Sequence, residues 1–215
     1  MIQTMCEEVS LRERLRDDAA SVLAEAFTRD RTRLCRMVQF RLDPVVAARV
    51  DIDDVMQDAW LAAVQRVGYF IENESLSMFV WLRLIVGQTI VDLHRHHLGA
   101  EMRDAYREVS LNRTAPSWST SISIAARLLG RVTTPSQAAM RRELAQQLEM
   151  AIEAMDPIDR EVLALRHFED LTNSEVAEAL GIAAKAASIR YVRAVKRLKA
   201  ILQELPDYEE VASDG

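Results

Sequence analysis

The chain has 215 residues, with 33 acidic and 27 basic side chains and a formal net charge of −6. Its 49% apolar and 28% charged residues exclude a wholly disordered or collagen-like protein. With only 6 glycines and 5 prolines, the composition favours helices over turn-rich sandwiches and glycine-looped nucleotide folds. The negative net charge also argues against indiscriminate coating of nucleic acid, so any basic surface must be local.

The cysteines and the hydropathy pattern indicate a reduced, soluble protein. Cys6 and Cys35 are too few for a disulfide framework. Residues 1–18 carry charges where a secretory signal needs an apolar run. The longest apolar stretch, 78–91, is interrupted by charged and polar residues and is shorter than the roughly 20 residues of a bilayer span. We therefore expect a cytoplasmic protein with no membrane insertion.

Helical periodicity organises residues 1–108. One helix is predicted over 10–42, ending at an Asp-Pro pair, a second begins near Asp51, and a third runs from about 77 to 97. The second helix has an apolar stripe that predicts its buried face. This stripe comprises Ile52, Val55, Met56, Ala59 and Ala63, and the opposite face carries Asp54, Gln57, Asp58, Leu61 and Gln65.

The composition changes between residues 109 and 136. Ten of these 28 residues are Ser or Thr, which predicts a flexible interdomain linker. Helical periodicity then resumes, and Asp156 followed by Pro157 has the pattern of a capped helix start. The sequence therefore predicts two small helical domains, residues 1–108 and 137–215, joined by the linker.

The second domain contains a helix-turn-helix pattern. Thr172 and Glu175 have the spacing of a capping box, and Gly181 supplies the left-handed turn before a long helix over about 184–202. Residues 179–203 contain six cations and no acid, as expected for a helix that lies in a DNA major groove. The alternative is a solvated cationic helix face. The side chains expected to point outward are Lys185, Ser188, Arg190, Arg193, Lys196, Arg197 and Lys199.

Four segments resemble the extracytoplasmic-function (ECF) sigma factors, which are small two-domain members of the sigma-70 family. Residues 53–60 (DDVMQDAW) are similar to region 2.2 of that family. Residues 79–95 are similar to the run that reads and melts the minus-ten promoter element. Residues 155–162 and 171–194 are similar to region 4, which reads the minus-thirty-five element, although Ala183 replaces the usual capping serine.

The resemblance implies an alternative sigma factor for transcription initiation. Its expected partners are core RNA polymerase, through the beta-prime clamp helices and the beta flap, promoter DNA and an anti-sigma factor. The polymerase-binding residues that it implies are Asp53, Asp54, Gln57, Asp58 and Leu61. For the minus-ten element they are Tyr69, Phe70, Asn73, Ser75, Trp81, Gln88, Asp92 and Arg95. For the minus-thirty-five element they are Thr172, Lys185, Ser188, Arg190, Arg193, Lys196 and Arg197.

The residue chemistry agrees with these roles, with alternatives. The exposed carboxylates near Asp54 form either an acidic docking surface or a solvated helix face. Trp81, Gln88 and Arg95 line one side of a helix and suit unstacked bases and phosphates, although Trp81 is equally suited to core packing. Tyr69 and Phe70 form either a wall of a flipped-base pocket or a closure of the helical bundle.

No catalytic or metal motif stands out. His94 and His97 are three residues apart on one predicted helix, but no third ligand of matching geometry is evident, so we expect neither a metal nor another cofactor. We also expect no enzymatic activity. Two other functions compete with the sigma-factor interpretation, namely a stand-alone helix-turn-helix repressor or activator and a helical adaptor without a DNA role.

Overall fold

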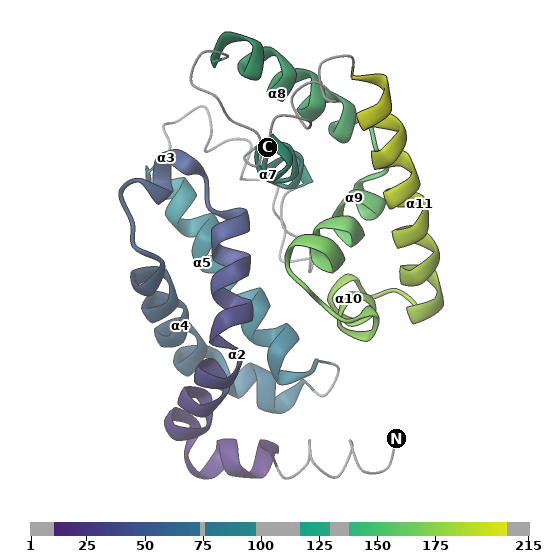
Figure 1. Ribbon diagram of the computed structural model, residues 1–215. Coiled ribbons are helices and arrows are strands. Elements are labelled where there is room, and N and C mark those ends of the chain that lie inside the picture. Colours follow the sequence, from purple (N-terminus) through teal and green to yellow (C-terminus); the bar gives the residue numbers. More distant parts are fainter. Residues whose placement is uncertain (1–10, 74–75, 98–116, 130–137, 206–215) are drawn as a thin grey trace. The chain divides into compact units, whose positions relative to one another are not determined.

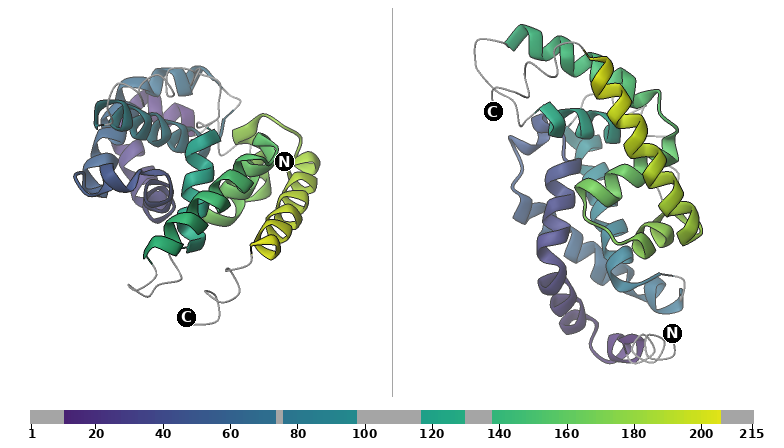
Figure 2. Two further views of the ribbon diagram at one scale, coloured as in Figure 1. Left: turned by 90° about the horizontal axis from the view of Figure 1, so that it is seen from above. Right: turned by 45° about the vertical axis from the view of Figure 1, so that its right-hand side comes forward.

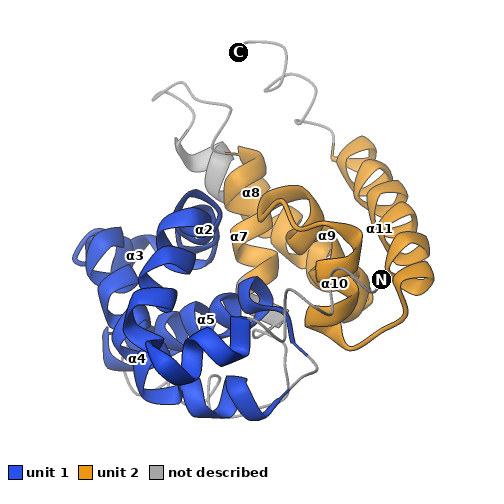
Figure 3. Cartoon of the chain, turned by 90° about the horizontal axis from the view of Figure 1, so that it is seen from below, with its two compact units in different colours: residues 1–108 blue, residues 109–215 orange. Residues whose placement is uncertain are grey.

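The computed structural model describes residues 11–73, 76–97, 117–129 and 138–205 (Figure 1). These residues form helices and no strand, which confirms the predicted all-α fold for the described part of the chain. The chain divides into two compact units, unit 1 (Met1–Glu108) and unit 2 (Val109–Gly215), which are coloured separately in Figure 3. No helix in the described ranges is both long enough and apolar enough to cross a membrane.

Unit 1 is built on three long helices. These are α2 (Ala19–Arg41), α4 (Ile52–Glu72) and α5 (Met78–His97), and each packs against the other two (Figures 1 and 2). The short helix α3 (Pro44–Ala47) packs against α5. As predicted, α4 buries Val55, Met56, Ala59 and Ala63, because apolar side chains at helical spacing share one face.

The helix predicted over residues 10–42 is interrupted at Asp18. Residues 11–17 are helical, and α2 begins after Asp18, whose carboxylate accepts a hydrogen bond from the Ser21 amide at 3.1 Å. The side chain therefore caps a new helix, which the periodicity of the apolar residues does not reveal. The predicted start of α4 is confirmed, since Asp51 accepts a hydrogen bond from the Asp53 amide at 2.9 Å.

Unit 2 contains the predicted helix-turn-helix. Helices α10 (Asn173–Leu180) and α11 (Ala184–Glu204) pack together, and α11 also contacts α9 (Pro157–Leu163) and α8 (Ala138–Glu153). A π-helical turn, η2 (Ala164–Phe168), follows α9. Thr172 and Glu175 form the predicted capping box. Gly181 has a φ of 64°, so its left-handed backbone makes the turn that a side chain would strain.

The structure differs from the predicted linker within residues 109–136. Helix α7 (Ser117–Leu129) lies in this stretch and packs against α8 and α9. Thr120 donates a hydrogen bond at 2.8 Å to Glu161 of α9, and Ser121 donates one to Glu153 of α8. Two of the hydroxyl groups that led to the linker prediction, those of Thr120 and Ser121, are therefore buried partners of carboxylates.

Arg160 and Glu161 fasten the helices of unit 2 together. The Arg160 guanidinium is buried, lies 2.8 Å from the Glu153 carboxylate and donates a hydrogen bond at 2.9 Å to the Glu153 carbonyl. Arg160 thus supplies a hydrogen-bond donor to the end of α8, where the last carbonyl groups lack partners within the helix. Through these two residues α9 is bonded to α7 and α8, and α11 packs against α9 and α8.

Candidate nucleic-acid interface

Helix α11 presents one buried face and one exposed face. Ala187, Ala194, Leu198 and Ile201 are buried against the rest of unit 2. The side chains of Lys185, Ser188, Lys196, Arg197 and Lys199 are exposed, as the sequence predicts. Ala183 caps α11 without a side-chain hydrogen bond. The exposed face thus offers a lysine and a serine near the helix start and three cations further along.

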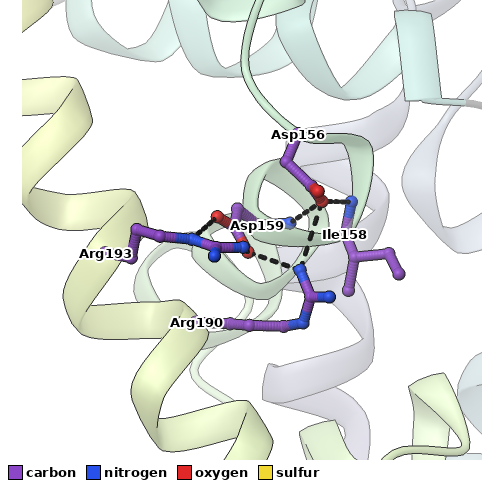
Figure 4. Close-up of polar contacts among 5 residues, drawn as sticks. All are labelled: Asp156, Ile158, Asp159, Arg190 and Arg193. Carbon is purple, nitrogen blue, oxygen red and sulfur yellow. Dashed lines mark hydrogen bonds and ion pairs between the residues drawn. The ribbon is translucent and has the colours of Figure 1, made fainter.

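Two cations of α11, Arg190 and Arg193, form ion pairs with acids of α9. Arg193 is exposed as predicted, whereas Arg190 is only partly exposed. The Arg190 guanidinium donates hydrogen bonds to Asp159 at 2.7 Å and to Asp156 at 3.2 Å (Figure 4). The Arg193 guanidinium holds the Asp159 carboxylate through two hydrogen bonds, one of them 2.8 Å long. Asp156 also accepts hydrogen bonds from the amides of Ile158 and Asp159, so it caps α9 at the same time.

This arginine–aspartate cluster, formed by Asp156, Asp159, Arg190 and Arg193, stabilises the ionised form of its buried acid. Burial opposes ionisation of Asp159, but hydrogen bonds from Arg193 and Arg190 outweigh it, so the pKa of Asp159 is lowered. The two acids balance the two arginines in charge. Arg190, whose side chain is 27% exposed, is therefore an anchor of α11 on α9, which corrects its expected outward role.

A polar contact joins the two helices at the start of α11. Asn173 Nδ2 donates a hydrogen bond to the Ala184 carbonyl at 2.8 Å, and Asn173 Oδ1 accepts one from the Ser188 hydroxyl at 3.1 Å. Thr172, predicted to contact DNA, is exposed, and its hydroxyl accepts the Glu175 amide at 3.2 Å. Asn173 carries no signal in the sequence beyond its place at the first position of α10.

The aromatic residues of unit 1 divide into core and surface. Trp81 and Phe70 are 2% and 1% exposed, and their ring centroids lie 4.9 Å apart. Their burial corrects the expectation that these two side chains meet DNA, because they close the helical bundle instead. Tyr69, in contrast, is 62% exposed, and its hydroxyl accepts a hydrogen bond from Asn73 Nδ2 at 3.0 Å.

Polar side chains of α4 and α5 meet at Arg66 and Gln88. Arg66 of α4 donates a hydrogen bond to the Gln88 side chain of α5. Further along α5, Arg95 lies 3.4 Å from Asp92. Ser75, the remaining residue expected at the minus-ten element, lies outside the described residues. Tyr69 is therefore exposed and Asn73 and Gln88 are partly exposed, and the exposed Arg66 joins them although it lies outside the sequence motifs.

The predicted polymerase-binding residues lie on the exposed face of α4. Asp54, Gln57, Asp58 and Leu61 are exposed, and within the described ranges neither Asp54 nor Asp58 has an ion-pair partner. Asp53 forms an ion pair with Arg31 of α2. A groove of about 310 Å³ lies beside this pair. Its lining residues are Ala24, Phe27, Thr28, Arg31, Asp53, Met56, Gln57 and Trp60.

His94 has a structural role. Its Nε2 accepts a hydrogen bond from the Asp43 amide at 3.0 Å, which requires an unprotonated nitrogen. Burial lowers the pKa of His94 from its ordinary value of 6.5, although nearby Asp43 opposes the shift. Within the described part of the chain, no cluster of three or more metal-ligating side chains is found.

Comparisons with known proteins find a matching family model, a related sequence and a similar solved structure. Residues 145–198, which include α10 and most of α11, match the family model "Sigma-70, region 4". The chain is 28% identical over 155 residues to the RNA polymerase sigma factor NccH of Alcaligenes xylosoxydans xylosoxydans, covering 71% of this chain and 74% of that protein. It also resembles the solved structure of CnrH in complex with the cytosolic domain of CnrY, with a TM-score of 0.48 and 22% identity over 90% of this chain and 95% of that one. The helix-turn-helix unit is therefore similar to sigma-70 region 4, and the chain is similar over most of its length to an RNA polymerase sigma factor, in agreement with the resemblance of its sequence motifs to the ECF sigma factors.

Proposed function

We propose that the chain is an alternative sigma factor of the ECF type that directs core RNA polymerase to promoters with minus-ten and minus-thirty-five elements. The observation that carries the proposal is the region 4 match over a helix-turn-helix whose second helix exposes cations in an acidic chain. A protein that met DNA through its whole surface would need a positive net charge, whereas a single basic helix suits a defined site.

Unit 1 binds core polymerase through the exposed face of α4. Asp54 and Asp58 lie one helical turn apart, and Gln57 and Leu61 extend the same surface. An acidic surface of this kind suits a basic partner, and the family resemblance assigns that partner to the clamp helices of the beta-prime subunit. The Arg31–Asp53 pair and the adjacent groove form one border of this surface.

Unit 1 also contacts the minus-ten element after the DNA strands separate. Tyr69 is the exposed ring available for stacking, and Asn73 and Gln88 supply amides that reach base edges. Arg66, bonded to Gln88, adds a cation for the phosphate backbone. The buried Trp81 supports this surface from within the bundle.

Unit 2 places α11 in the major groove of the minus-thirty-five element. Lys185 and Ser188 near the helix start face the bases, and Lys196 and Arg197 contact phosphates. The arginine–aspartate cluster fixes the angle of α11 on α9. An anti-sigma factor that covers these surfaces in the resting cell completes the proposal, as the family resemblance implies.

A test of this function compares DNA binding with and without core polymerase. The chain alone should bind a duplex promoter weakly, and the holoenzyme should bind it tightly, whereas a stand-alone repressor or activator would bind equally well without polymerase. The double variant Asp54→Arg with Asp58→Arg should lose association with polymerase and remain folded, because both side chains are exposed.

The matched control is Glu13→Arg with Asp17→Arg, which reverses two exposed acids at the same helical spacing in residues 11–17. This control should co-purify with polymerase at the wild-type yield. Equal yields for the two double variants, whether high or low, would contradict the assignment of the docking surface to α4.

A further inference from the structure

Asn173 sets the direction of the hydrogen bond that Ser188 can make. The Ala184 carbonyl only accepts, so the Asn173 group that lies 2.8 Å from it is the donating Nδ2. The Oδ1 atom must then face Ser188, and it accepts the hydroxyl proton over 3.1 Å. Because a hydroxyl has one proton, Ser188 retains only acceptor lone pairs toward the solvent.

Ser188 lies on the exposed face of α11, one turn after Lys185. Arg190, which could otherwise form a bidentate contact with guanine, is bonded to Asp156 and Asp159. The neighbouring exposed side chains are apolar, with Ile189 and Val192 at 58% and 52% exposure. Such side chains suit the methyl group of thymine, so at this edge of the helix the exposed donor for guanine is Lys185, one turn before Ser188.

We propose that Ser188 reads a base that presents an exocyclic amino group in the major groove, with Asn173 as its positioning residue. Adenine N6 and cytosine N4 are the two donors of this kind, whereas guanine and thymine present oxygen acceptors that repel the Ser188 lone pairs. The inference rests on the proposed placement of α11 in the minus-thirty-five element. It adds a base preference that the two-helix motif alone does not contain.

The experiment selects promoters from a library with a randomised upstream element, using holoenzyme in one arm and the chain alone at low salt in the other. The wild-type protein should enrich adenine or cytosine about fivefold at one position, and the recovered sequences tell the two bases apart. Ser188→Ala should remove the preference at that position only. Ser188→Thr, which keeps the hydroxyl, should retain it.

Variants of Asn173 separate positioning from a purely structural role. Asn173→Ala releases the hydroxyl proton, so guanine and thymine should be recovered at the Ser188 position about as often as adenine and cytosine. Asn173→Asp loses the donor to the Ala184 carbonyl but keeps an acceptor for the Ser188 hydroxyl, so it should retain the preference. Ser174→Ala, at an exposed serine of the same helix, is the matched control and should select like the wild type. Thermal denaturation of each variant checks that unit 2 remains folded.

The outcomes distinguish this inference from the proposed function. A Ser188-dependent preference for guanine or thymine would overturn the inference, and so would an unchanged preference in a folded Asn173→Ala variant. The absence of any Ser188-dependent preference in both arms would also overturn it. If the chain alone shows the preference but the holoenzyme selects no promoter, the proposed sigma-factor role fails and the base assignment stands.

Discussion

Tyr69 and Trp81 should respond in opposite ways to truncation, although both are aromatic residues of the same unit. Trp81 is 2% exposed and packs on Phe70, so Trp81→Ala removes a ring from the core and should cost about 3–5 kcal/mol in the free energy of unfolding. That is a large share of the roughly 5–15 kcal/mol by which a small domain is stable. Tyr69 is 62% exposed, so Tyr69→Ala should stay within about 0.5 kcal/mol of the wild type.

The effects on promoter opening by folded protein should be in the reverse order, with Tyr69 contributing more than Trp81. A lost base stack costs about 1–3 kcal/mol, which corresponds to roughly a 5- to 150-fold smaller open-complex equilibrium constant for Tyr69→Ala. Tyr69→Phe keeps the ring and loses only the hydroxyl that accepts from Asn73, so it should open promoters nearly as well as the wild type.

Urea denaturation measures the first effect, and permanganate footprinting of thymines near the start site measures the second. A pre-melted bubble template should partly rescue Tyr69→Ala, because the strands are already separated. Wild-type reactivity of Tyr69→Ala on duplex DNA would refute the assignment of the stacking face, and wild-type stability of Trp81→Ala would refute its core role.

Three further predictions concern the remaining polar groups. Asp159→Asn should lower the unfolding free energy of unit 2 by about 2 kcal/mol, measured by urea denaturation, because it removes the charge that Arg190 and Arg193 share. Arg197→Gln should reduce the slope of log binding constant against log salt by about one for holoenzyme on the upstream element, whereas Arg190→Gln should leave that slope unchanged and destabilise unit 2. The unfolding free energy of unit 1 should decrease as the pH falls below 6.5. The pKa of His94 is lower in the folded state than in the unfolded chain, so the unfolded chain binds more protons in this range. The decrease should be absent in His94→Gln.

The helices and the helix-turn-helix were predictable because they depend on local patterns. Thr172 and Gly181 are capping and turn residues at fixed offsets from apolar stripes, and each acts as predicted, while the second helix begins next to Asp51 as expected. The Asp18 cap and helix α7 were not predicted. Periodicity continues across Asp18, and Thr120 and Ser121 of α7 bond to carboxylates that are distant in the sequence.

The side-chain roles were harder to predict because they depend on contacts between helices. The spacing of Trp81 and Gln88 places them on one side of α5, but only the packing of α4 shows that the first is buried and that the second meets Arg66. In the same way, Arg190 belongs to a cationic run in the sequence, and its partners lie 31 and 34 residues away. Charge counting identifies a basic helix and does not tell which cations are already paired.

Run-off transcription with purified core polymerase, this chain and a pool of genomic promoter fragments tests the central claim most directly. We expect discrete transcripts that require both proteins and that disappear with the Asp54→Arg and Asp58→Arg double variant. The templates of these transcripts should share two sequence elements at a fixed spacing. Transcripts that do not depend on the chain, or promoter binding by the chain that is equally strong without polymerase, would contradict this claim.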